Sequence, residues 1–530
     1  MNSGLTRIHF QIWKFTSPFG NQRPNEEIHF QIGKLTSPLG NELTALAVHF
    51  DFSKKMRWRD LLELDQNQPI PDDFFDSPRK LHFIGIGGIG MSALAFLALA
   101  RGVSVSGSDE NDGPMLAKLR GAGAQVFVGH AASNLENAEA VVFSSAISDE
   151  NAEFEAAKNA GIPCFHRSQL MAHFANRAKV SIAVSGTHGK STTSAMISHL
   201  LEREGHNPTA ILGAVYPPFE TNFRVGNPDL VVVEADESDG SFSLLKPTVA
   251  LVLNLEPEHL ENYDDDSNEL ERAFKMFCAN AKFCVLNRDE RLKRLDDSPF
   301  SFFYGRESGT LNFTKIEKFA GKTEFDVRFV SAPLGRFCLR VPGLHNVSNA
   351  VAALGACAKA LDVSSPLALK ALARHFETFA GTLRRFERKG EAKNIAVYDD
   401  YGHHPTEVRA TLGAAREFLA RPICVVFQPH RYSRTQALWR EFGEAFGSAD
   451  KIIITQLYSA HETPIAGVSG RLIFDEVHRK SGGKPVFYAE NLEDAKTLAL
   501  ELLEEGDALL TMGAGDITRL GPQILEALRA

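Results

Sequence analysis

The sequence predicts an α/β protein of three domains, each built on a mostly parallel β-sheet. From Lys80 onward, short β-branched runs alternate with amphipathic helical stretches, which is the pattern of parallel strands joined by crossover helices. Two of the expected strands run directly into glycine-rich turns that open a helix. The 530 residues, 44% of them hydrophobic, are enough for roughly three cores at about 150 residues per domain.

The expected strands fall into three groups. The first group comprises 81–84, 103–106, 125–128 and 140–143, and the second comprises 180–184, 230–233, 249–253 and 283–286. The third comprises 395–398, 423–427, 451–454, 485–488 and 508–512. We therefore expect a first domain at 79–178, a central domain at 179–380 and a C-terminal domain at 381–530.

The first 55 residues have a different pattern. The pentapeptide at 8–12 (IHFQI) recurs at 28–32 and, in degraded form, at 48–52, a period of 20 residues. Repeats of this length need about three good copies to bury a shared core, so we expect that 1–55 does not fold alone. The favoured interpretation is a translated stretch of repetitive upstream DNA with Met56 as the true start, and the alternative is a small adaptor arm.

Charge and composition exclude several classes of protein. The 57 basic and 66 acidic residues leave a net charge of −9, which does not favour nucleic acid as a partner. The six cysteines show no CxxC or zinc-finger spacing, so we expect reduced thiols. No apolar run of about 18 residues and no signal-peptide pattern is present. We expect a cytoplasmic protein with no membrane partner, either a monomer or a weak homodimer.

The first glycine-rich turn indicates a nucleotide site. It follows the strand at 81–84 and contains Gly85, Gly87, Gly88 and Gly90. Such a turn lets backbone N–H groups at a helix N-terminus approach a diphosphate, and Asp109, 19 residues after Gly90, can bond a ribose hydroxyl. A dinucleotide and a UDP-sugar both fit, and the alternative is a turn that serves only helix–sheet packing.

The second turn, GTHGKSTT at 186–193, is a shortened phosphate loop. Its backbone N–H groups would hold a β-phosphate, Lys190 would neutralise the β and γ oxygens, and Ser191 would offer its hydroxyl to Mg²⁺. Glu234, at the end of the strand 230–233, is a candidate magnesium ligand. We expect the neighbouring Asp236, Glu237 and Asp239 to belong to a solvated acidic loop.

Polar residues follow other strand ends as well. Asn254 and His259 come after 249–253, where a structural role and a ligand or phosphate contact are about equally expected. The third group adds Arg384 and Arg385 and the clusters 399–407 and 428–434. Because arginine binds carboxylates bidentately, the arginines of the last cluster can fix an amino acid or a phosphorylated intermediate; surface ion pairs are the alternative.

Taken together, these motifs resemble the Mur ligase family, in particular its alanine-adding member. The resemblance covers about 80–530 and includes five stretches, at 82–92, 186–193, 344–349, 399–407 and 428–435. It implies an N-terminal Rossmann-like domain for a UDP-sugar, a central P-loop ATPase domain with a mostly parallel sheet, and a C-terminal Rossmann-like domain for the acceptor. Two glutamates, Glu258 and Glu261, stand where the family pattern leads us to expect aspartates, and nothing before Lys80 has a counterpart.

The resemblance also implies the site residues. Those facing the UDP-sugar would be Gly85, Gly87, Gly88, Gly90, Asp109, His130 and Ser145. Those binding ATP would be Gly186, Thr187, His188, Gly189, Lys190, Ser191, Thr192, Asn346 and Asn349, with Ser191, Glu234 and His259 at the metal. The acceptor would meet Tyr401, His403, Arg431 and Arg434, and the catalytic group would comprise Lys190, His259, His403, His430, Arg431 and Arg434.

The implied activity is ATP-dependent ligation of L-alanine to the carboxylate of UDP-N-acetylmuramate in peptidoglycan synthesis. An acyl phosphate would form first, with Mg²⁺ or Mn²⁺ as cofactor, and His403, His430 or phosphate would take the amine proton. Selectivity against serine or glycine stays open, because one methyl or hydroxyl changes affinity by only about 1–3 kcal/mol. The alternatives are a tripeptide-recycling ligase, a nicotinamide dehydrogenase, which leaves Lys190 unexplained, and a non-catalytic nucleotide-binding scaffold.

Overall fold

The computed structural model describes residues 35–36, 42–43, 57–75, 79–289, 291–295, 301–460 and 462–530. The chain divides into two units, Met1–Asp51 and Phe52–Ala530. In the first unit, β1 (Leu35–Thr36) and β2 (Glu42–Leu43) pair antiparallel. The repeats at 8–12, 28–32 and 48–52 lie outside the described residues, as does Met56. All that follows concerns the second unit.

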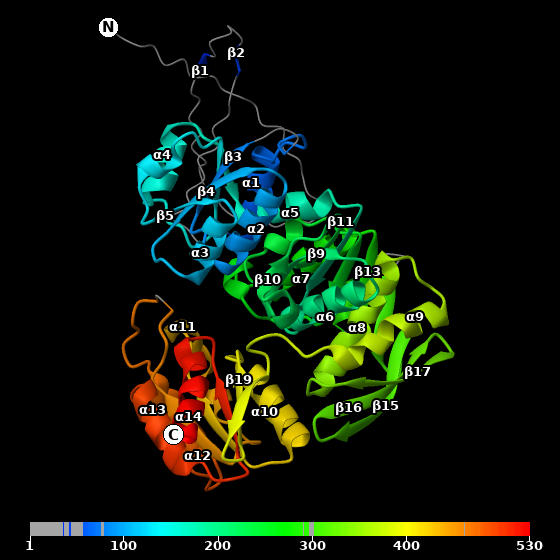
Figure 1. Cartoon of the computed structure of the whole chain (residues 1–530), viewed down its shortest axis with the longest axis vertical. Helices are drawn as coiled ribbons and strands as arrows, with labels where there is room; N and C mark the ends of the chain where they lie inside the picture. Colours follow the sequence, from blue (N-terminus) through cyan, green and yellow to red (C-terminus); the bar gives the residue numbers. More distant parts are fainter. Residues whose placement is uncertain are drawn as a thin grey trace, which may run out of the picture. The chain divides into compact units, whose positions relative to one another are not determined.

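The first sheet of this unit has five parallel strands (Figure 1). They are β3 (Lys80–Ile84), β4 (Ser104–Asp109), β5 (Gln125–Val128), β6 (Ala140–Phe143) and β7 (Cys164–His166), in the order β5-β4-β3-β6-β7. The helices are α2 (Ile89–Ala100), α3 (Pro114–Gly121), α4 (Ala152–Asn159) and α5 (Arg167–Asn176). The chain leaves β3 for β4 and returns to β6 on the other side. The glycine-rich turn after β3 therefore lies at a switch point, where such sheets bind ligands.

The central sheet has ten strands, and its middle is parallel. In spatial order they are β10 (Thr221–Arg224), β9 (Pro208–Tyr216), β11 (Asn227–Glu234), β8 (Val180–Ser185), β12 (Val249–Val252), β13 (Phe283–Asn287), β14 (Ser301–Arg306), β15 (Leu311–Phe319), β16 (Lys322–Phe329) and β17 (Ala332–Leu339). The last three strands form an antiparallel meander, and β10 is an antiparallel edge. The helices are α6 (Lys190–Arg203), α7 (Ser267–Ala279), α8 (Leu344–Ala360) and α9 (Pro366–Ala373), with α6 packed beside α8.

The third sheet has six strands in the order β18-β19-β23-β20-β21-β22. They are β18 (Glu387–Ala392), β19 (Ile395–Asp400), β20 (Ile423–Phe427), β21 (Lys451–Thr455), β22 (Val486–Ala489) and β23 (Ala508–Met512). All pair parallel except the edge strand β18. The helices are α10 (Pro405–Leu419), α11 (Tyr432–Phe442), α12 (Gly470–Lys480), α13 (Leu492–Leu502) and α14 (Leu520–Arg529). Separate apolar clusters cover the two faces of this sheet.

The predicted fold class is confirmed, and each expected strand is present with ends that differ by a few residues. Eight strands of this unit were not predicted: β7, β9, β10, β14, β15, β16, β17 and β18. Several of these strands are half-exposed; β16, for example, alternates buried and partly exposed residues, so its sequence has no continuous apolar run. Within the described residues, no helix is both long enough and apolar enough to cross a membrane.

Helix α1 (Trp58–Asn67) was not anticipated. Trp58 is only 6% exposed, and its ring lies 6.5 Å from that of Tyr263 in the central domain. The Arg59 guanidinium lies 2.6 Å from the Glu269 carboxylate, while Gln169 of α5 donates to the carbonyl of Gln68 at 2.9 Å. The segment before Lys80 therefore holds a helix that contacts both the first and the central sheet regions.

Candidate active site

The phosphate-type loop lies between β8 and α6 and is held by the end of the neighbouring strand. Gly186 and Gly189 have φ of 129° and 86°, in the left-handed region that favours glycine, and a Cβ on Gly186 would lie 3.0 Å from the backbone of Asn254. Asn254 accepts from the His188 N–H at 2.7 Å and donates to the His188 carbonyl at 2.9 Å. The loop is thus preset by a polar residue that follows β12.

Lys190 opens α6 and forms a buried ion pair. Its Nζ lies 2.7 Å from Glu237 Oε2 and donates to the carbonyls of Gly186 at 2.9 Å and Thr187 at 3.3 Å. Burial alone would lower the pKa of Lys190, but the charges of Glu237, Asp236 and Glu234 outweigh it and raise the pKa above its usual value. The ammonium is therefore charged and positioned at the phosphate loop.

The expectation of a solvated acidic loop after Glu234 is wrong for Glu237. That residue is 2% exposed and pairs with Lys190, and its carbonyl accepts from the Tyr263 hydroxyl. Asp236 lies 3.7 Å from Lys190, and Asp239 lies 2.5 Å from Arg167 of α5. The loop folds inward because each acid meets a cation, a pairing that buried charges require.

Two of the three predicted metal ligands meet. The Ser191 hydroxyl donates to Glu234 Oε1 at 3.1 Å, and the other carboxylate oxygen accepts from Gly213 N at 2.7 Å. A hydroxyl and a carboxylate beside a phosphate loop are oxygen ligands of the kind that Mg²⁺ prefers. His259 lines the same cavity as these two residues, and its Nδ1 lies 3.9 Å from Glu261. These residues fit a magnesium ion.

Most of the predicted site residues line two adjoining cavities. The smaller, of about 310 Å³, is lined by the predicted ATP residues His188, Gly189, Ser191, Thr192, Asn346 and Asn349. The larger, of about 870 Å³, is lined by Gly90, Thr187, Lys190, Glu234, His259, Tyr401, His403, His430, Arg431 and Arg434. Four residues line both cavities: His188, Ser191, Arg385 and Glu407. A cavity lined by predicted ATP residues therefore opens beside a larger cavity of the size that small-molecule sites have, whose lining contains both cations and carboxylates.

His430, which follows β20, has one fixed hydrogen-bonding role. Its ring stacks on Tyr458, with centroids 5.7 Å apart and planes 8° apart, and its Nδ1 lies 3.2 Å from Arg434 Nη1. Because guanidinium only donates, Nδ1 must accept, and the neutral ring carries its proton on Nε2. Burial, reinforced by the nearby His403 and Arg434, lowers the pKa of His430 to about 3. His430 is therefore a neutral Nε2–H donor.

His403, which follows β19, has the opposite tautomer. Its Nδ1 lies 3.0 Å from the carbonyl of Tyr401, which can only accept, so the proton is on Nδ1 and Nε2 is free to accept. Burial lowers the pKa of His403 to about 4. The rings of His403 and His430 have centroids 5.8 Å apart. One neutral histidine can thus take a proton where its neighbour donates a hydrogen bond.

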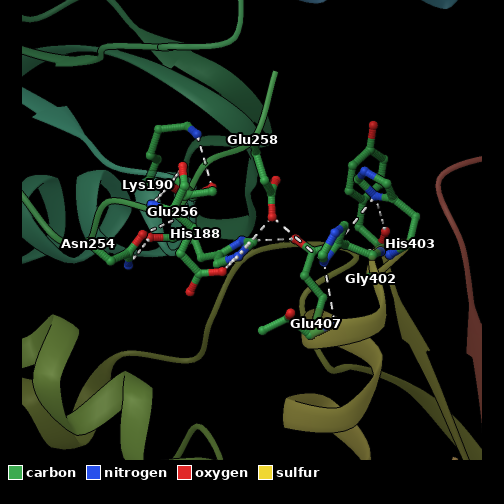
Figure 2. A network of polar contacts seen from close by, with 12 residues as sticks. His188, Lys190, Asn254, Glu256, Glu258, Gly402, His403 and Glu407 are labelled. Carbon is green, nitrogen blue, oxygen red and sulfur yellow. Dashed lines mark hydrogen bonds and ion pairs between the residues drawn. The ribbon is translucent and has the colours of Figure 1, made fainter. Parts of the chain in front are cut away.

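A charged network centres on His188 (Figure 2). Its Nε2 lies 3.3 Å from Glu258 and 3.6 Å from Glu256, and its Nδ1 lies 3.7 Å from Glu407 of α10. Burial would lower the pKa of His188, but these three carboxylates outweigh it and raise the pKa to about 11. His188, Glu256 and Glu258 are close enough to share a cation. A protonated imidazole cannot be a metal ligand, so we interpret the cluster as ion pairs.

Sequence reasoning missed four functional residues in this region: Glu237, Glu256, Arg385 and Glu407. Glu407 belonged to a noted cluster but was given no role, and Arg385 was noted only as a cation. The available signal was position, because Glu237, Glu256 and Glu407 each follow a strand that ends at the loop edge of its sheet. Glu237 and Glu256 meet partners within the central domain, whereas Glu407 meets His188 only when the central and C-terminal sheets are both folded.

Most of the residues predicted to bind the UDP-sugar do not line either cavity. Only Gly90 among them lines the larger cavity, together with Ile89. Asp109 accepts from the Gly87 N–H at 2.9 Å, so it braces the glycine-rich turn. The remaining polar members make internal contacts: His130 Nδ1 lies 2.8 Å from Ser108, and Ser145 lies 3.0 Å from His166 Nε2. Their roles toward a ligand stay predictions.

Three family models match the chain in succession. The model described as Mur ligase family, catalytic domain, matches 80–179. The Mur ligase middle domain matches 184–357, and the model described as Mur ligase, glutamate ligase domain, matches 384–515. Together these matches span most of the chain and contain all of the cavity-lining residues except Gly381, Thr382, Leu383 and Thr518.

Curated relatives and solved structures agree with these matches. A UDP-N-acetylmuramate–L-alanine ligase of Myxococcus xanthus is 40% identical over 457 residues, 85% of this chain and 95% of that protein. The enzyme of the same name from Solibacter usitatus is 41% identical over 473 residues, covering 88% and 98%. The crystal structure of a UDP-N-acetylmuramate–alanine ligase from Thermotoga maritima matches with a TM-score of 0.73 and 32% identity, covering 84% and 98%.

A murein peptide ligase from Psychrobacter arcticus also matches, with a TM-score of 0.61 over 85% of this chain and 99% of that one. Its identity to this chain is 23%, so the likeness is one of fold.

Proposed function

The chain belongs to the Mur ligase family, and on that premise we propose that it joins L-alanine to the carboxylate of UDP-N-acetylmuramate at the expense of ATP. The observation that carries the proposal is the pair of adjoining cavities, which places a phosphate loop beside a cluster of two histidines and two arginines. The relatives that are about 40% identical over most of their length bear the name of this reaction.

ATP would occupy the smaller cavity with its phosphates on the loop 186–189. The N–H groups at the start of α6 would bind the β-phosphate. Lys190, which donates to the carbonyls of Gly186 and Thr187, would exchange these carbonyls for phosphate oxygens. Asn346 and Asn349 of α8 line the same cavity, where their amides can contact the nucleotide. Magnesium, held by Ser191 and Glu234 with His259 nearby, would neutralise charge on the phosphates.

The first step activates the muramyl carboxylate. One carboxylate oxygen attacks the γ-phosphorus of ATP, the bond to the β-bridging oxygen breaks, and ADP leaves, which gives an acyl phosphate. Lys190, Arg431 and Arg434 line the same cavity, and Lys190 would stabilise the charge on the transferring phosphoryl group. A carboxylate is a poor acylating agent, so this step supplies the phosphate leaving group that the second step needs.

The second step forms the amide bond. The amine of L-alanine attacks the acyl carbon, a tetrahedral intermediate forms, and its collapse expels inorganic phosphate. We assign the proton that the nitrogen loses to Nε2 of His403, since Nδ1 already donates to the carbonyl of Tyr401. His430 would donate its Nε2–H to an oxygen of the intermediate or of the leaving phosphate.

The division of labour among domains is part of this proposal. Residues 79–178 would bind the UDP-sugar, 179–380 ATP, and 381–530 L-alanine, in a cytoplasmic enzyme that acts as a monomer or weak homodimer. Residues 1–55 have no role in it. Closure of the third domain over the other two would exclude water, which otherwise hydrolyses an acyl phosphate.

The tripeptide-recycling ligase is the second candidate, because it shares the sugar substrate and a murein peptide ligase has the same fold. Its identity of 23% against about 40% for the alanine-adding relatives favours alanine. A nicotinamide dehydrogenase would leave the buried Lys190–Glu237 pair and the phosphate loop without a purpose. A non-catalytic scaffold would give no reason for the complementary tautomers of His403 and His430.

The test is phosphate release from ATP and Mg²⁺ with UDP-N-acetylmuramate, adding L-alanine, L-serine, glycine, the tripeptide or nothing in parallel. We expect release that depends on both the sugar and L-alanine. Release with the tripeptide alone would assign the recycling reaction instead, and no release with any acceptor would overturn the ligase assignment.

A further inference from the structure

Glu407 occupies the wall between the two cavities and lines both. It is the third residue of α10, and its Oε2 accepts from the backbone N–H of His403 at 2.9 Å and of His404 at 3.2 Å. Its Oε1 faces the other way, 3.7 Å from His188 Nδ1 and 3.9 Å from Arg385 Nη1. One carboxylate thus touches the acceptor-side turn with one oxygen and the nucleotide loop with the other (Figure 2).

Capping of helix α10 does not require a negative charge at position 407. Capping needs only an oxygen that accepts from the free N–H groups, and an amide serves as well as a carboxylate. Helix α13 has an acid at the same third position, Asp494, but there the side chain is exposed and bonds only locally. Glu407 is largely buried, and a buried carboxylate is stable only where cations compensate it.

The two cations near Glu407, His188 and Arg385, come from two domains that the proposed reaction must bring together. His188 belongs to the phosphate loop of the central domain, whereas Arg385 belongs to the C-terminal part of the chain. The His403 ring also faces Glu407, with Nδ1 3.6 Å from Oε2. A shift of the phosphate loop can therefore reach the acceptor turn through Glu407, which accepts from the backbone N–H groups of that turn. Glu258 is a second link, but it meets only the side chain of His404, at 3.6 Å.

We propose that Glu407 is a positioning residue for the ligation, whose negative charge couples the nucleotide loop at His188 to the acceptor turn at His403. This inference rests on the proposed function, and it assigns Glu407 no contact with substrate. It predicts that a change at His188, on the nucleotide side, alters the use of L-alanine, and that the effect passes through Glu407.

Three variants distinguish the effect of the negative charge of Glu407 from its role as a helix cap. Glu407→Gln keeps an amide oxygen for the N–H groups of His403 and His404 but removes the charge that faces His188 and Arg385. Glu407→Asp keeps the charge on a side chain one methylene shorter, and acidic residues are well tolerated in a first helical turn. Asp494→Asn is the matched control, because it makes the same change at the same helix position far from either cavity.

We expect Glu407→Gln to lower kcat roughly tenfold to hundredfold and to raise the KM for L-alanine, as the loss of a charge-assisted contact does. The loss of kcat should exceed what any fall in the thermal midpoint relative to Asp494→Asn explains, because Glu256 and Glu258 still pair with His188. Glu407→Asp should recover part of kcat. A variant Glu407→Gln with wild-type kcat and KM would overturn the proposal. So would a loss of activity that only mirrors a loss of the thermal midpoint while Glu407→Asp recovers nothing.

A double-mutant cycle tests the coupling itself. His188→Gln should raise the KM for L-alanine in the wild-type chain and have little further effect in the Glu407→Gln chain. Equal effects in both chains, or none in either, would contradict the coupling through Glu407. The wild-type assay separates this result from the proposed function. If the wild type shows no release of phosphate dependent on sugar and L-alanine, the function fails; if it does, only the role of Glu407 is at stake.

Discussion

The Lys190 ammonium lies 2.7 Å from the Glu237 carboxylate; the Glu237 side chain is 3% exposed and that of Lys190 13%. This pair holds the lysine of the phosphate loop charged and in place before any phosphate is bound. Its burial depends on residues distant in sequence, since Tyr263 donates its hydroxyl to the Glu237 carbonyl and Trp58 packs against Tyr263. The phosphate loop is therefore supported by α1 and the acidic loop together.

Removing Lys190 should affect activity and stability separately. Lys190→Met should abolish phosphate release and lower the free energy of unfolding by about 3 kcal/mol or more, because Glu237 loses the partner of its buried charge. Lys190→Met combined with Glu237→Gln should regain most of that stability and none of the activity. Urea unfolding and phosphate release measure the two effects. A single variant as stable as the wild type would show that the pair does not compensate a buried charge.

The two histidines should tolerate different substitutions. A glutamine amide can replace an Nε2–H donor, so His430→Gln should keep a substantial part of kcat. An asparagine can replace the Nδ1–H of His403 but offers no base, so His403→Asn should lower kcat about 10²-fold or more. Steady-state kinetics of both variants at saturating substrates measures this contrast. The reverse order of activities would show that the proton goes to His430.

The charge of His188 gives a pH dependence with a definite sign. Its pKa is raised from 6.5 to about 11 against the effect of burial, by Glu256, Glu258 and Glu407. A group with a raised folded pKa stabilises fully below its unfolded pKa, and the stabilisation is lost as pH rises from 6.5 toward 11. The difference in unfolding free energy between the wild type and His188→Gln should therefore shrink between pH 7 and 10, as urea unfolding at several pH values would measure. A difference that grows with pH would contradict a protonated His188.

Helix α1 should be essential to the fold although the segments before it are not. A chain that starts at Met56 keeps Trp58 and should retain both its thermal midpoint and its activity. Trp58→Ala should lower the free energy of unfolding by about 3–5 kcal/mol, the usual effect of removing a buried tryptophan. The Arg57→Ala variant, at an exposed side chain of the same region, is the control. An unchanged midpoint for Trp58→Ala would show that α1 is dispensable.

The local patterns of the sequence predicted the three sheets, the glycine-rich loop at 186–189 and the polar clusters that follow β19 and β20. These features depend on residues adjacent in the chain, such as the strand 180–184 followed by the loop 186–189. The polar residues at strand ends, including Glu234, His403 and His430, could be found because parallel strands deliver their ends to one edge of a sheet.

What the sequence did not predict depends on contacts between distant segments. Glu237 looked like a solvated acid, since its burial requires Tyr263 and, through it, Trp58, a residue assigned to no domain. Glu407 and His188 lie 3.7 Å apart, but they belong to two different domains of the chain. The tautomers of His403 and His430 follow from partners that only the folded chain supplies.

The acyl-phosphate route is the central claim, and the transfer of labelled oxygen tests it most directly. UDP-N-acetylmuramate carrying oxygen-18 in its carboxylate is turned over with ATP, Mg²⁺ and L-alanine, and the products are analysed by mass spectrometry. The route predicts one labelled oxygen in the released phosphate and the other in the new amide carbonyl. Phosphate without label, formed alongside the amide product, would contradict the acyl phosphate, and absence of the amide product would contradict the ligase itself.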